Sequence, residues 1–534
     1  MPGDRKGAGI LENNWHTIAD IPPTFAKTQP NAIAFSFEGR ETTFDEFDRH
    51  TNQVANALIA AGVKKGDRVC YLGKNSDHYF ELFLGAAKMG AVTTPIGWRL
   101  APPEVGYIVN DSAAPFLFVG PEFTGAAKIA LQEAPRVKTV IAMEGGVPEW
   151  QGFEAWRDAQ PSTPPNVELK SSDIAIQLYT SGTTGRPKGA MLMHSNFVET
   201  HRIMKAAKIN WNIWSTDDVS LVAMPVSHIG GSGWALMGLR NGAKNVVARE
   251  FVPGQVLDFI ANERISKIFL VPAAIQIVLR DPRARETDYS RMKHLGYGAS
   301  PIPLDLLREA VEVFGCGFAQ MYGMTETTGT IVALPPEDHD LNGNPRMRSA
   351  GKPLPGVEVI VLDEAGNRLP TGQVGEIATR SAWNMAGYWN LPEATAKTID
   401  KDGWLRTGDA GYLDEDGYVY IHDRVKDMII SGAENVYPAE VESAIYGHPD
   451  VADVAVIGVP DDKWGEAVKA IVVRKPGKTP SPEDIIAFAR TRVAAFKAPK
   501  TVDFIEALPR NASGKILRRE LREPFWAGRT RRVN

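Results

Sequence analysis

Cysteine is scarce in this sequence, which has 534 residues and two cysteines, Cys70 and Cys316. Two cysteines cannot form a disulfide framework or a cysteine-rich zinc site, so the composition favours a reducing compartment. A secretory signal is also missing, because the polar residues 1–6 lead into no continuous apolar stretch. We therefore expect a cytoplasmic protein.

Long hydrophobic runs are scarce as well. The longest candidate, residues 265–279, is interrupted by Ser266, Lys267, Pro272 and Gln276. A membrane-spanning helix needs about 20 mostly apolar residues, so this stretch is better explained as a buried strand and the start of a helix. We expect no integral membrane segment.

An excess of charge of one sign is absent too, because 59 Lys and Arg nearly balance 64 Asp and Glu. The formal net charge of −5 disfavours bulk binding of nucleic acids. The charge is divided unevenly, since residues 424–534 carry 19 cationic and 15 acidic residues, a net of +4, which leaves −9 for the rest. A local excess of charge usually reflects only charged side chains on a solvent-exposed face. The alternative is a mobile lobe that brings cations to a phosphate-bearing ligand.

The sequence does contain enough apolar residues for several cores. Its hydrophobic fraction of 43% excludes a disordered chain, and its length predicts about three or four structural units. Residues 43–46 have the form of a helix capping box, and apolar residues follow at helical spacing up to Gly62. Short β-rich runs alternate with helical stretches, which favours parallel sheets covered by helices. The runs are residues 66–72, 91–95, 174–178, 219–224, 267–271 and 294–298.

The pattern changes from about Val357. Turn residues at 363–366 and 414–417 separate β-rich runs, which predicts hairpins and a small antiparallel, β-barrel-like region. Beyond Asp423, strands at 454–459 and 468–473 and a helix over 482–495 predict a compact α+β unit. We therefore expect an α/β protein with a large N-terminal domain, residues 1–423, and a small mobile α+β C-terminal domain, residues 424–534. The large domain is expected to contain two α/β subdomains and the small β region.

The strongest local signal is the segment YTSGTTGRPKG at 179–189, which follows the apolar run 174–178. Small hydroxyl residues and glycines expose backbone N–H groups that can surround phosphate oxygens, and Lys188 adds a charge. The segment is not the P-loop of NTPases, because Pro187 stands five places after Gly182. An ordinary surface loop is the alternative. Four Ser or Thr, three Gly and two cations in eleven residues disfavour it.

Together with five further motifs, this segment resembles the adenylate-forming enzyme superfamily. That superfamily includes acyl-CoA synthetases, the adenylation domains of peptide synthetases and firefly luciferase, and the chain is most similar to a fatty-acid–CoA ligase. The motifs follow the family's order along nearly the whole chain: QMYGMTE at 320–326, WLRTGD at 404–409, DRVKD at 423–427, SGAEN at 431–435 and PRNASGK at 509–515. Each motif alone is weak, but the ordered set is specific.

The resemblance implies an ATP-dependent carboxylic acid–CoA ligase. In such enzymes a carboxylate attacks the α-phosphorus of ATP, pyrophosphate leaves, and the acyl adenylate then passes its acyl group to the thiol of CoA with release of AMP. Negative charge gathers on phosphate oxygens in the first step, so catalysis depends on positioning and electrostatics. The implied substrates are a carboxylic acid, ATP and CoA, and the implied metal ion is Mg²⁺.

The resemblance places Lys515 at the attacking carboxylate and the α-phosphate. It makes Glu326 the magnesium ligand, for which a hard carboxylate oxygen is suited, and Thr325 a hydroxyl donor to phosphate. Without the motifs, a solvent-exposed lysine and a surface glutamate would be the ordinary interpretations.

The resemblance also assigns the nucleotide site. Asp409 is expected to accept hydrogen bonds from the ribose hydroxyls, with Arg424 nearby, and Tyr322 to lie against adenine. The small residues at 298–300 would let the backbone approach the ligand closely. The expected ATP-binding residues are Thr180, Ser181, Gly182, Thr183, Thr184, Gly185, Lys188, Gly298, Ala299, Ser300, Gln320, Tyr322, Gly323, Thr325, Asp409 and Arg424.

In the family, the small C-terminal domain rotates between the two steps and exchanges the catalytic lysine for a thiol tunnel. Lys426 matches the hinge position, where large changes in φ and ψ are absorbed. Gly432 and Ala433 match the CoA-binding position. Ala433 departs from the Gly-Gly pair common in the family, which puts a left-handed conformation there in doubt.

Residues 224–234 match the region that begins the acyl pocket. His228 is a candidate catalytic residue where carboxylate and phosphate meet, and a structural histidine with satisfied hydrogen bonds is the alternative. Trp234 would line the cavity or be an ordinary core residue. The expected pocket residues are His228, Gly230, Gly231, Trp234, Gly298 and Gly323. An uncharged pocket favours a hydrophobic fatty or aryl acid.

Three other functions stay open. The acyl group could pass to a carrier-protein thiol, the adenylate could be oxidised by oxygen as in luciferase, or the chain could bind a nucleotide without catalysis. A homodimer is also left open. The acidic segment at 337–340 contains residue types that bind metal ions, but we expect it to be a solvated loop.

Overall fold

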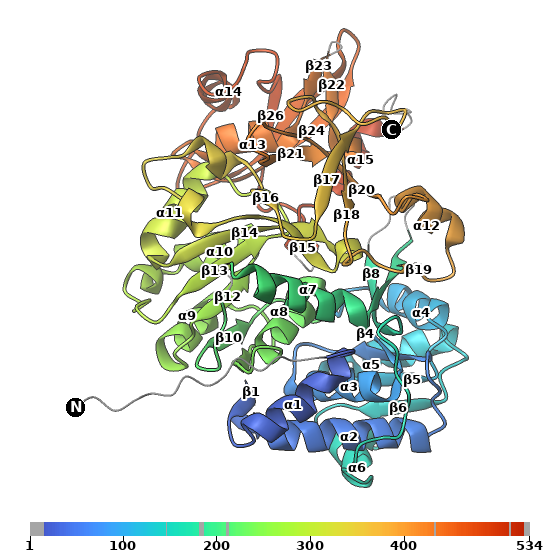
Figure 1. The fold of residues 1–534 in the computed structure, drawn as a ribbon. Coiled ribbons are helices and arrows are strands. Elements are labelled where there is room, and N and C mark those ends of the chain that lie inside the picture. Colours follow the sequence, from blue (N-terminus) through green and yellow to red (C-terminus); the bar gives the residue numbers. More distant parts are fainter. Residues whose placement is uncertain are drawn as a thin grey trace, which may run out of the picture.

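The computed structural model describes residues 15–145, 147–180, 186–209, 213–431, 434–511 and 514–527. Figure 1 shows two large α/β units in the N-terminal part and a small lobe formed by the C-terminal part of the chain. No helix in these ranges is both long and apolar enough to cross a membrane.

The first large unit is built on an eight-stranded mixed sheet. Its strand order is β19 (Gly387–Tyr388), β9 (Lys188–Met193), β8 (Ile174–Thr180), β4 (Val92–Ile96), β3 (Arg68–Leu72), β5 (Phe116–Val119), β6 (Thr139–Ala142) and β7 (Gln151–Gly152). The six strands from β8 to β7 in this order are parallel to one another. Strand β9 pairs antiparallel with both β8 and β19.

Alternate residues of β3 and β5 enter two different cores, because side chains alternate between the faces of a strand. On one face Val69 and Tyr71 pack with α2 (Phe44–Ala60) and α3 (Asp77–Met89). On the other face Cys70 and Leu72 pack with α4 (Pro102–Asp111) and α5 (Thr124–Ala130). The sheet is therefore covered by helices on both faces, as the sequence predicted.

The second large unit is built on a nine-stranded sheet. Its strand order is β16 (Lys352–Pro353), β15 (Gly329–Leu334), β14 (Gly317–Met324), β13 (His294–Gly298), β12 (Lys267–Leu270), β10 (Val219–Val222), β11 (Lys244–Val247), β1 (Ile33–Phe37) and β2 (Arg40–Thr43). The strands from β14 to β1 are parallel. Helices α8 (Ile229–Leu239), α9 (Pro253–Asn262), α10 (Pro272–Arg280) and α11 (Leu304–Phe314) alternate with its strands, whereas α1 (Ile21–Thr28) packs mainly on α2 and α7 (His194–Ala207) follows β9.

The capping box expected at residues 43–46 is confirmed. The Thr43 backbone N–H donates to the Glu46 carboxylate at 2.9 Å, and the Glu46 N–H donates to the Thr43 hydroxyl at 3.2 Å. This reciprocal pair satisfies two N–H groups that would lack partners at the start of α2. The helix ends at Ala60, and Gly62 takes a φ of +81° in the turn that follows.

A four-stranded antiparallel sheet links the large units to the C-terminal lobe. It contains β17 (Glu358–Leu362), β18 (Gly375–Arg380), β20 (Leu405–Leu413) and β21 (Val419–Arg424), in that order. The expected hairpins are present, since β17 pairs with β18 and β20 pairs with β21. A short helix, α12 (Pro392–Thr398), lies between β19 and β20.

The C-terminal lobe contains a second core around a five-stranded sheet. The strands are β22 (Ile429–Ser431), β23 (Glu434–Val436), β24 (Val451–Asp461), β25 (Gly465–Arg474) and β26 (Thr501–Ile505), with helices α13 (Pro438–Tyr446), α14 (Pro482–Arg490) and α15 (Arg518–Trp526). The expected fold class is thereby confirmed. The division at residue 423/424 stays a prediction.

Helix α14 ends earlier than the sequence predicted, at Arg490 rather than at residue 495. The Thr491 hydroxyl donates to the Phe488 carbonyl at 2.7 Å, and the Arg492 guanidinium pairs with Asp305 of α11 at 3.0 Å. Side-chain bonds of this kind compete with continuation of a helix. The residues after α14 therefore contact the large unit.

The acidic segment at 337–340 is only in part the solvated loop that we expected, since Glu337 and Asp340 are exposed but Asp338 is buried. Asp338 is only 5% exposed, at the end of a 3₁₀ helix, η7 (Pro336–Asp338). Its carboxylate accepts a hydrogen bond from the Tyr418 hydroxyl at 2.7 Å, and the His339 ring lies 3.0 Å from the Tyr297 hydroxyl. Partners from distant segments bury these polar groups.

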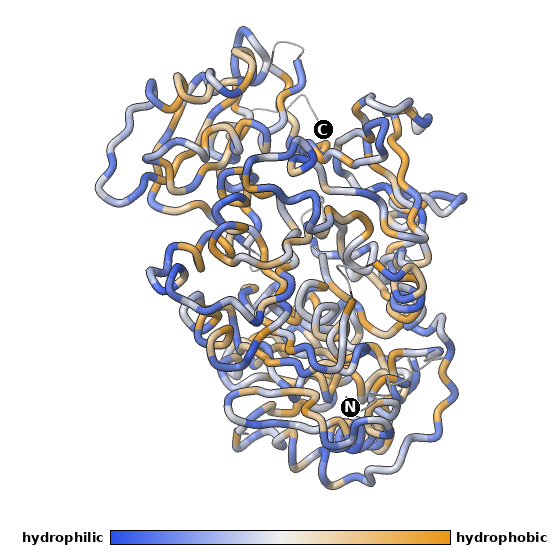
Figure 2. Tube along the Cα trace, turned by 60° about the vertical axis from the view of Figure 1, so that its left-hand side comes forward, coloured by the Kyte–Doolittle hydropathy of each residue, from blue (hydrophilic) through white to orange (hydrophobic). Residues whose placement is uncertain are grey.

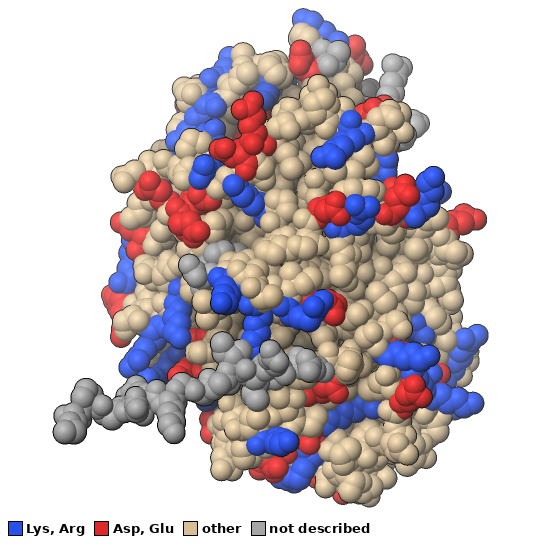
Figure 3. Space-filling model, in the orientation of Figure 1, with Lys and Arg blue, Asp and Glu red and all other residues tan. Residues whose placement is uncertain are grey.

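The surface agrees with the near balance of charge. In Figure 2 the loops at the edge of the molecule are predominantly hydrophilic, and hydrophobic segments lie mostly inside. Cationic and acidic side chains are interspersed over the face drawn in Figure 3.

Candidate active site

Three of the residues expected to bind nucleotide form one cluster where β14 meets the four-stranded sheet. The register of β20 and β21 places Asp409 opposite Arg424. The Arg424 guanidinium pairs with one carboxylate oxygen of Asp409 at 2.9 Å, and the Tyr322 hydroxyl donates to the other at 2.7 Å. Burial, followed by the nearby Asp409 charge, raises the pKa of Tyr322, so the phenol stays protonated and remains a donor. The structure therefore brings these three residues together.

Lys515 reaches this cluster from the C-terminal lobe. Burial and the positive charge of Arg424 lower the pKa of Lys515 to about 8, while Asp409 and Asp423 oppose this shift. The backbone N–H of Lys515 donates to the Asn511 side chain at 2.9 Å, which fixes the chain beside the lysine. The catalytic candidate of the C-terminal lobe thus interacts electrostatically with two of the candidate nucleotide residues, Arg424 and Asp409.

A small cavity of about 90 Å³ lies between the lobe and the large unit. Its wall includes Lys515 and Arg518 from the lobe and Ser300 and Leu306 from the large unit. Ser300, one of the expected ATP-binding residues, therefore faces the same cavity as Lys515.

A buried ionic cluster that the sequence analysis missed holds the lobe beside the end of β21. Arg518 pairs with Glu442 of α13 at 2.7 Å and with Asp423 of β21 at 3.4 Å. Burial raises the pKa of both carboxyl groups, and Arg518 opposes this shift. Asp423 also accepts a hydrogen bond from the Ala439 backbone N–H at 3.1 Å. Asp423 stood in a recognised motif, but nothing in the sequence indicated its partners.

Glu326, the candidate metal ligand, belongs to a second cluster. It is 5% exposed and lies in a 3₁₀ helix, η6 (Thr325–Thr327), directly after β14. One carboxylate oxygen, Oε1, accepts hydrogen bonds from the Tyr388 hydroxyl at 2.8 Å and from the Thr180 hydroxyl at 3.2 Å. The Lys188 ammonium lies 5.0 Å from the centre of the Tyr388 ring. Three predicted residues, Glu326, Thr180 and Lys188, thus meet around Tyr388.

Tyr388 is a site residue that the sequence analysis missed. It lies in the two-residue strand β19, which is too short to give a periodic signal. Burial, followed by the Glu326 charge, raises its pKa, so the hydroxyl remains a donor to the carboxylate. The bond orients Glu326, because a carboxylate fixed through one oxygen presents the other in a defined direction.

Thr180 and Lys188 are opposite each other in the β8–β9 ladder, so the glycine-rich segment is the connection of this hairpin. The predicted residues Ser181, Gly182, Thr183, Thr184 and Gly185 lie outside the described residues, and so do the predicted CoA-binding residues Gly432 and Ala433. Lys426 lies in the 3₁₀ helix η9 (Val425–Asp427), which connects β21 to β22.

Gly298 and Gly323 have a structural reason to be glycine. A methyl group on Gly298 would lie 2.0 Å from the Met321 carbonyl oxygen, and one on Gly323 would lie 1.8 Å from the Gly329 carbonyl oxygen. The sequence analysis attributed residues 298–300 to close approach of a ligand. The neighbouring strand and turn are sufficient to require glycine at Gly298 and Gly323.

Ala299 takes a φ of +68°, a conformation that L-residues rarely adopt. Gln320, in turn, accepts a bond from the Tyr297 hydroxyl at 3.4 Å.

His228 occupies the N-cap position of α8, in the turn between β10 and this helix, and its side chain makes no capping bond. Its Nε2 atom is buried and has no hydrogen-bond partner among the described residues. Burial, followed by the charge of Arg99, lowers the pKa of His228 to about 4, so the ring is neutral near pH 7. The Nε2 atoms of His194 and His201 are buried without a described partner in the same way, so both interpretations of His228 fit the structure.

Two glycines in this region, Gly230 and Gly296, lie beside an apolar side chain. A methyl group on Gly230 would lie 3.1 Å from the Phe269 ring, and one on Gly296 would lie 3.4 Å from the same ring. Trp234 is 6% exposed and packs edge-on against Trp214, with ring centres 5.4 Å apart. Trp234 is thus a core residue that packs against Phe269. The sequence analysis gave an ordinary core position as the alternative to lining the cavity.

Gly231 packs against the turn that precedes α8. A methyl group there would lie 2.2 Å from the Pro225 carbonyl oxygen. Gly231 therefore keeps the turn close to the helix.

Comparison with known proteins places this arrangement among known enzymes. The family model described as AMP-binding enzyme matches residues 23–389, and the model of the AMP-binding enzyme C-terminal domain matches residues 440–515. The chain is 43% identical to a fatty acid–[acyl-carrier-protein] ligase, ScoC, of Streptomyces coeruleorubidus, over 97% of this chain and 98% of that protein. It is 38% identical to a feruloyl-CoA synthase of an Amycolatopsis species, over 95% and 99% of the two chains.

A solved structure supports the same assignment. The crystal structure of the anthranilate CoA ligase AuaEII in complex with anthranoyl-AMP aligns with a TM-score of 0.88 and 28% identity, over 96% of this chain and 97% of that one. The resemblance inferred from the motifs is confirmed, and the chain belongs to the AMP-binding enzyme family.

Proposed function

We propose that this enzyme joins a hydrophobic carboxylic acid to CoA in two steps. In the first, a carboxylate oxygen attacks the α-phosphorus of ATP, an acyl adenylate forms, and pyrophosphate leaves. In the second, the sulfur of CoA, having lost its proton, attacks the acyl carbon, the thioester forms, and AMP leaves.

The observation that carries this proposal is the cavity that Lys515 shares with Ser300, together with the effect of Arg424 and Asp409 on the pKa of Lys515. Negative charge develops on the α-phosphate oxygens during the attack, and a cation stabilises it most where water is excluded. With its pKa at about 8, Lys515 is still mostly protonated at pH 7. Lys515 and Arg424 can then act together on the phosphate.

The remaining nucleotide contacts follow from the same cluster. A carboxylate can accept about four hydrogen bonds. Asp409 therefore has room for both ribose hydroxyls while it keeps Tyr322 and Arg424. In this arrangement Tyr322 positions Asp409 and offers its ring to adenine.

Glu326 fits a magnesium ion. Both of its described hydrogen bonds go to Oε1, which leaves Oε2 for a cation. Mg²⁺ prefers oxygen ligands and usually retains several waters, so a single carboxylate beside the phosphates is sufficient. When bound, the ion would neutralise charge on the phosphates of ATP. Tyr388 and Thr180 would hold Glu326 in place, and Thr325 would donate its hydroxyl to a phosphate oxygen.

The acid is proposed to be a fatty or aryl acid. Phe269, Met321 and Ile229 lie beside the glycines of this region, which supports an apolar pocket, and the neutral His228 can hydrogen-bond a carboxylate without adding a charge. The named relatives point in the same direction, because their names refer to fatty acid, feruloyl and anthranilate substrates.

CoA is proposed as the thiol acceptor, with a carrier protein as the second candidate because ScoC is named for one. For the second step, we propose that residues 424–534 rotate about Lys426 as a domain against residues 1–423. Gly432 and Ala433 would then line the path of the thiol. We further propose that the enzyme acts in the cytoplasm, since its two cysteines suit a reducing compartment.

The test is a panel of fatty acids of graded chain length and of aryl acids, each incubated with ATP and Mg²⁺. CoA is supplied in one series and a carrier protein with its pantetheine arm in another. The proposal predicts acyl-CoA and AMP in equal amounts with at least one acid. Acyl transfer to the carrier protein alone would favour the second candidate, and light emission or oxygen uptake would favour oxidation of the adenylate. Absence of acid-dependent pyrophosphate across the panel would refute the ligase.

A further inference from the structure

The turn that carries His228, residues 224–228, belongs to the second large unit, but two of its hydrogen bonds come from Asn75 of the first. Within the turn, the His228 backbone N–H donates to the Pro225 carbonyl at 3.0 Å. The turn is mostly buried, and it lies between β10 and the first turn of α8. The groups that hold it from outside therefore decide where the His228 ring points.

Asn75 supplies most of those outside bonds. Its side-chain oxygen accepts from the Val226 backbone N–H at 2.9 Å, and its side-chain nitrogen donates to the carbonyl oxygens of Met224 at 3.1 Å and Ala248 at 2.9 Å. Asn75 is 1% exposed, and it lies between β3 and α3 of the first large unit. Two of its three side-chain bonds go to the turn, and the third goes to the residue after β11.

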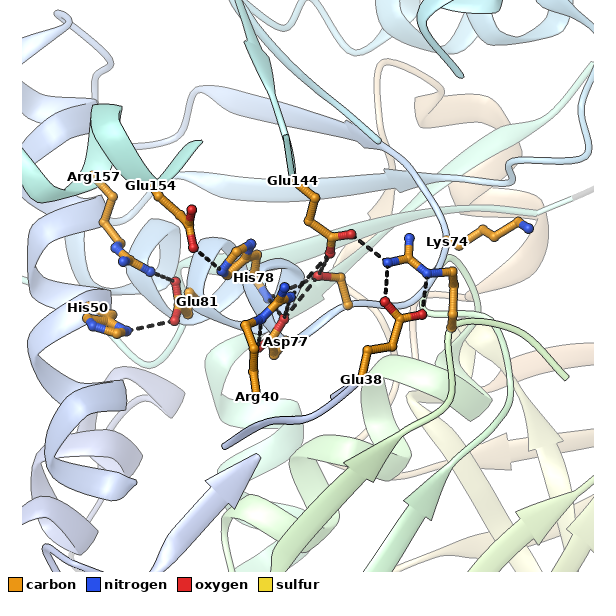
Figure 4. A network of polar contacts seen from close by, with 12 residues as sticks. Glu38, Arg40, His50, Lys74, Asp77, His78, Glu81, Glu144, Glu154 and Arg157 are labelled. Carbon is orange, nitrogen blue, oxygen red and sulfur yellow. Dashed lines mark hydrogen bonds and ion pairs between the residues drawn. The ribbon is translucent and has the colours of Figure 1, made fainter. Parts of the chain in front are cut away.

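The backbone around Asn75 is itself anchored by a network of ion pairs (Figure 4). Arg40 of β2 pairs with Asp77 at 2.7 Å, and Lys74 pairs with Glu250 at 2.6 Å. The Asn75 backbone N–H donates to the Arg249 carbonyl at 3.0 Å.

Arg249 is held in turn by the carboxylates of Glu38 and Glu144, at 2.7 Å each. Asn75 therefore projects from a segment that is fixed on both sides.

A second bond from the first unit supports the same turn. The Tyr79 hydroxyl of α3 lies 2.7 Å from the Ser232 hydroxyl, which donates to the Val226 carbonyl at 2.6 Å. Asn75 thus binds the N–H of Val226, and the pair of Tyr79 and Ser232 binds its carbonyl. Both polar backbone groups of Val226 are therefore satisfied from outside the turn.

We propose that Asn75 is a positioning residue for the adenylation step, because it holds the turn that aims His228 Nε2 at the reacting carboxylate. This inference rests on the proposed function, in which His228 contacts the substrate. Misplacement of a reacting group by about 1 Å can reduce a rate by about 10²-fold. The hydrogen bonds that hold this turn are therefore expected to affect the rate of adenylation as well as the structure. Tyr79 assists through Ser232.

The experiment is a double-mutant cycle on the full-length enzyme, with the best acid from the panel and pyrophosphate release as the signal. The variants are Asn75→Ala, His228→Ala and the double variant, and kcat and KM for ATP and for the acid are measured for each. If Asn75 acts through His228, Asn75→Ala lowers kcat about 10- to 100-fold in the presence of His228. It then lowers kcat less than about twofold in the His228→Ala background. KM for ATP is expected to stay within about threefold of the original value.

Two further variants protect the test from effects on folding. Tyr79→Phe keeps the buried ring and removes only the hydroxyl, so it carries the same cycle with a smaller loss if Asn75→Ala does not fold. Lys128→Gln is the control, because it removes an exposed ion pair of the first large unit, with Glu149 at 3.0 Å, and no bond to the turn or to the segment that carries Asn75. Its small effect on kcat is expected to multiply with that of His228→Ala, as independent changes do.

The outcomes separate this inference from the proposed function. If the Asn75 or Tyr79 variant lowers kcat by the same factor in the presence and in the absence of His228, the positioning role is overturned. Wild-type adenylation by His228→Ala would overturn it as well, but would leave the ligase intact. A wild-type enzyme that releases no pyrophosphate with any acid would overturn both.

Discussion

Replacing Lys515 with alanine is expected to slow adenylation by about 10²–10³-fold. A unit positive charge about 4 Å from a phosphate oxygen contributes about 4 kcal/mol at an effective dielectric constant near 20. Lys515 is half-buried, so this value suits its surroundings. Arg424 remains in the variant and retains part of the stabilisation. A net loss of about 3–4 kcal/mol follows, and each 1.36 kcal/mol corresponds to a factor of ten in rate.

The assay separates the two half-reactions. Pyrophosphate release from ATP and the acid reports the first, and the reaction of synthetic acyl adenylate with CoA reports the second. Lys515→Ala is expected to impair the first and to spare the second within about threefold. Lys478→Ala is the matched control, since that lysine belongs to the same lobe but is 56% exposed. Near-wild-type pyrophosphate release by Lys515→Ala would refute the reasoning.

Three further predictions concern pH, the metal ion and the hinge. The cationic form of Lys515 is the active one and burial lowers its pKa to about 8, so kcat/KM for adenylation is expected to fall as pH rises through about 8. Lys515→Arg should stay active to higher pH, and identical profiles for the two proteins would contradict the assignment. Glu326→Gln is expected to raise the half-saturating concentration of Mg²⁺ at least about 10-fold, and Tyr388→Phe to raise it by a smaller factor. An unchanged magnesium titration for Glu326→Gln would exclude Glu326 as a ligand. Lys426→Pro is expected to leave pyrophosphate release within about threefold and to block thioester formation, because proline fixes φ. Equal loss of both half-reactions would count against a hinge.

Local sequence signals predicted the elements that carry the site. The capping box at Thr43 and the strand His294–Gly298 lie where they were expected. The strand Ile174–Thr180 continues two residues past its predicted end, as far as the glycine-rich segment. Caps and alternation depend on a few neighbouring residues, so a single sequence contains them.

Contacts between distant segments were not predictable in this way. Gly298 and Gly323 were attributed to a ligand, whereas carbonyl oxygens of Met321 and Gly329 already exclude a side chain at these positions. Asp338 was expected in a solvated loop because its segment follows two prolines, but Tyr418, 80 residues away, binds its buried carboxylate. Strand register and tertiary packing decide such outcomes, and neither is encoded in a short window.

The candidate site shows the same difference between residues with a local sequence signal and contacts between distant segments. The motifs indicated Glu326, Asp409, Arg424 and Lys515, and the structure brings them into two adjoining clusters. The partners that orient these residues carry no local signal. Asn75, for example, stands just before the start of α3, and its role follows from bonds to Met224, Val226 and Ala248, about 150–170 residues later in the chain.

The most direct test of the central claim is the exchange of labelled pyrophosphate into ATP. Reversible formation of an acyl adenylate predicts exchange that needs the carboxylic acid and Mg²⁺, needs no CoA, and falls about 10²–10³-fold in Lys515→Ala. Exchange that is independent of the acid, or no exchange with any acid that the enzyme converts to a thioester, would contradict it.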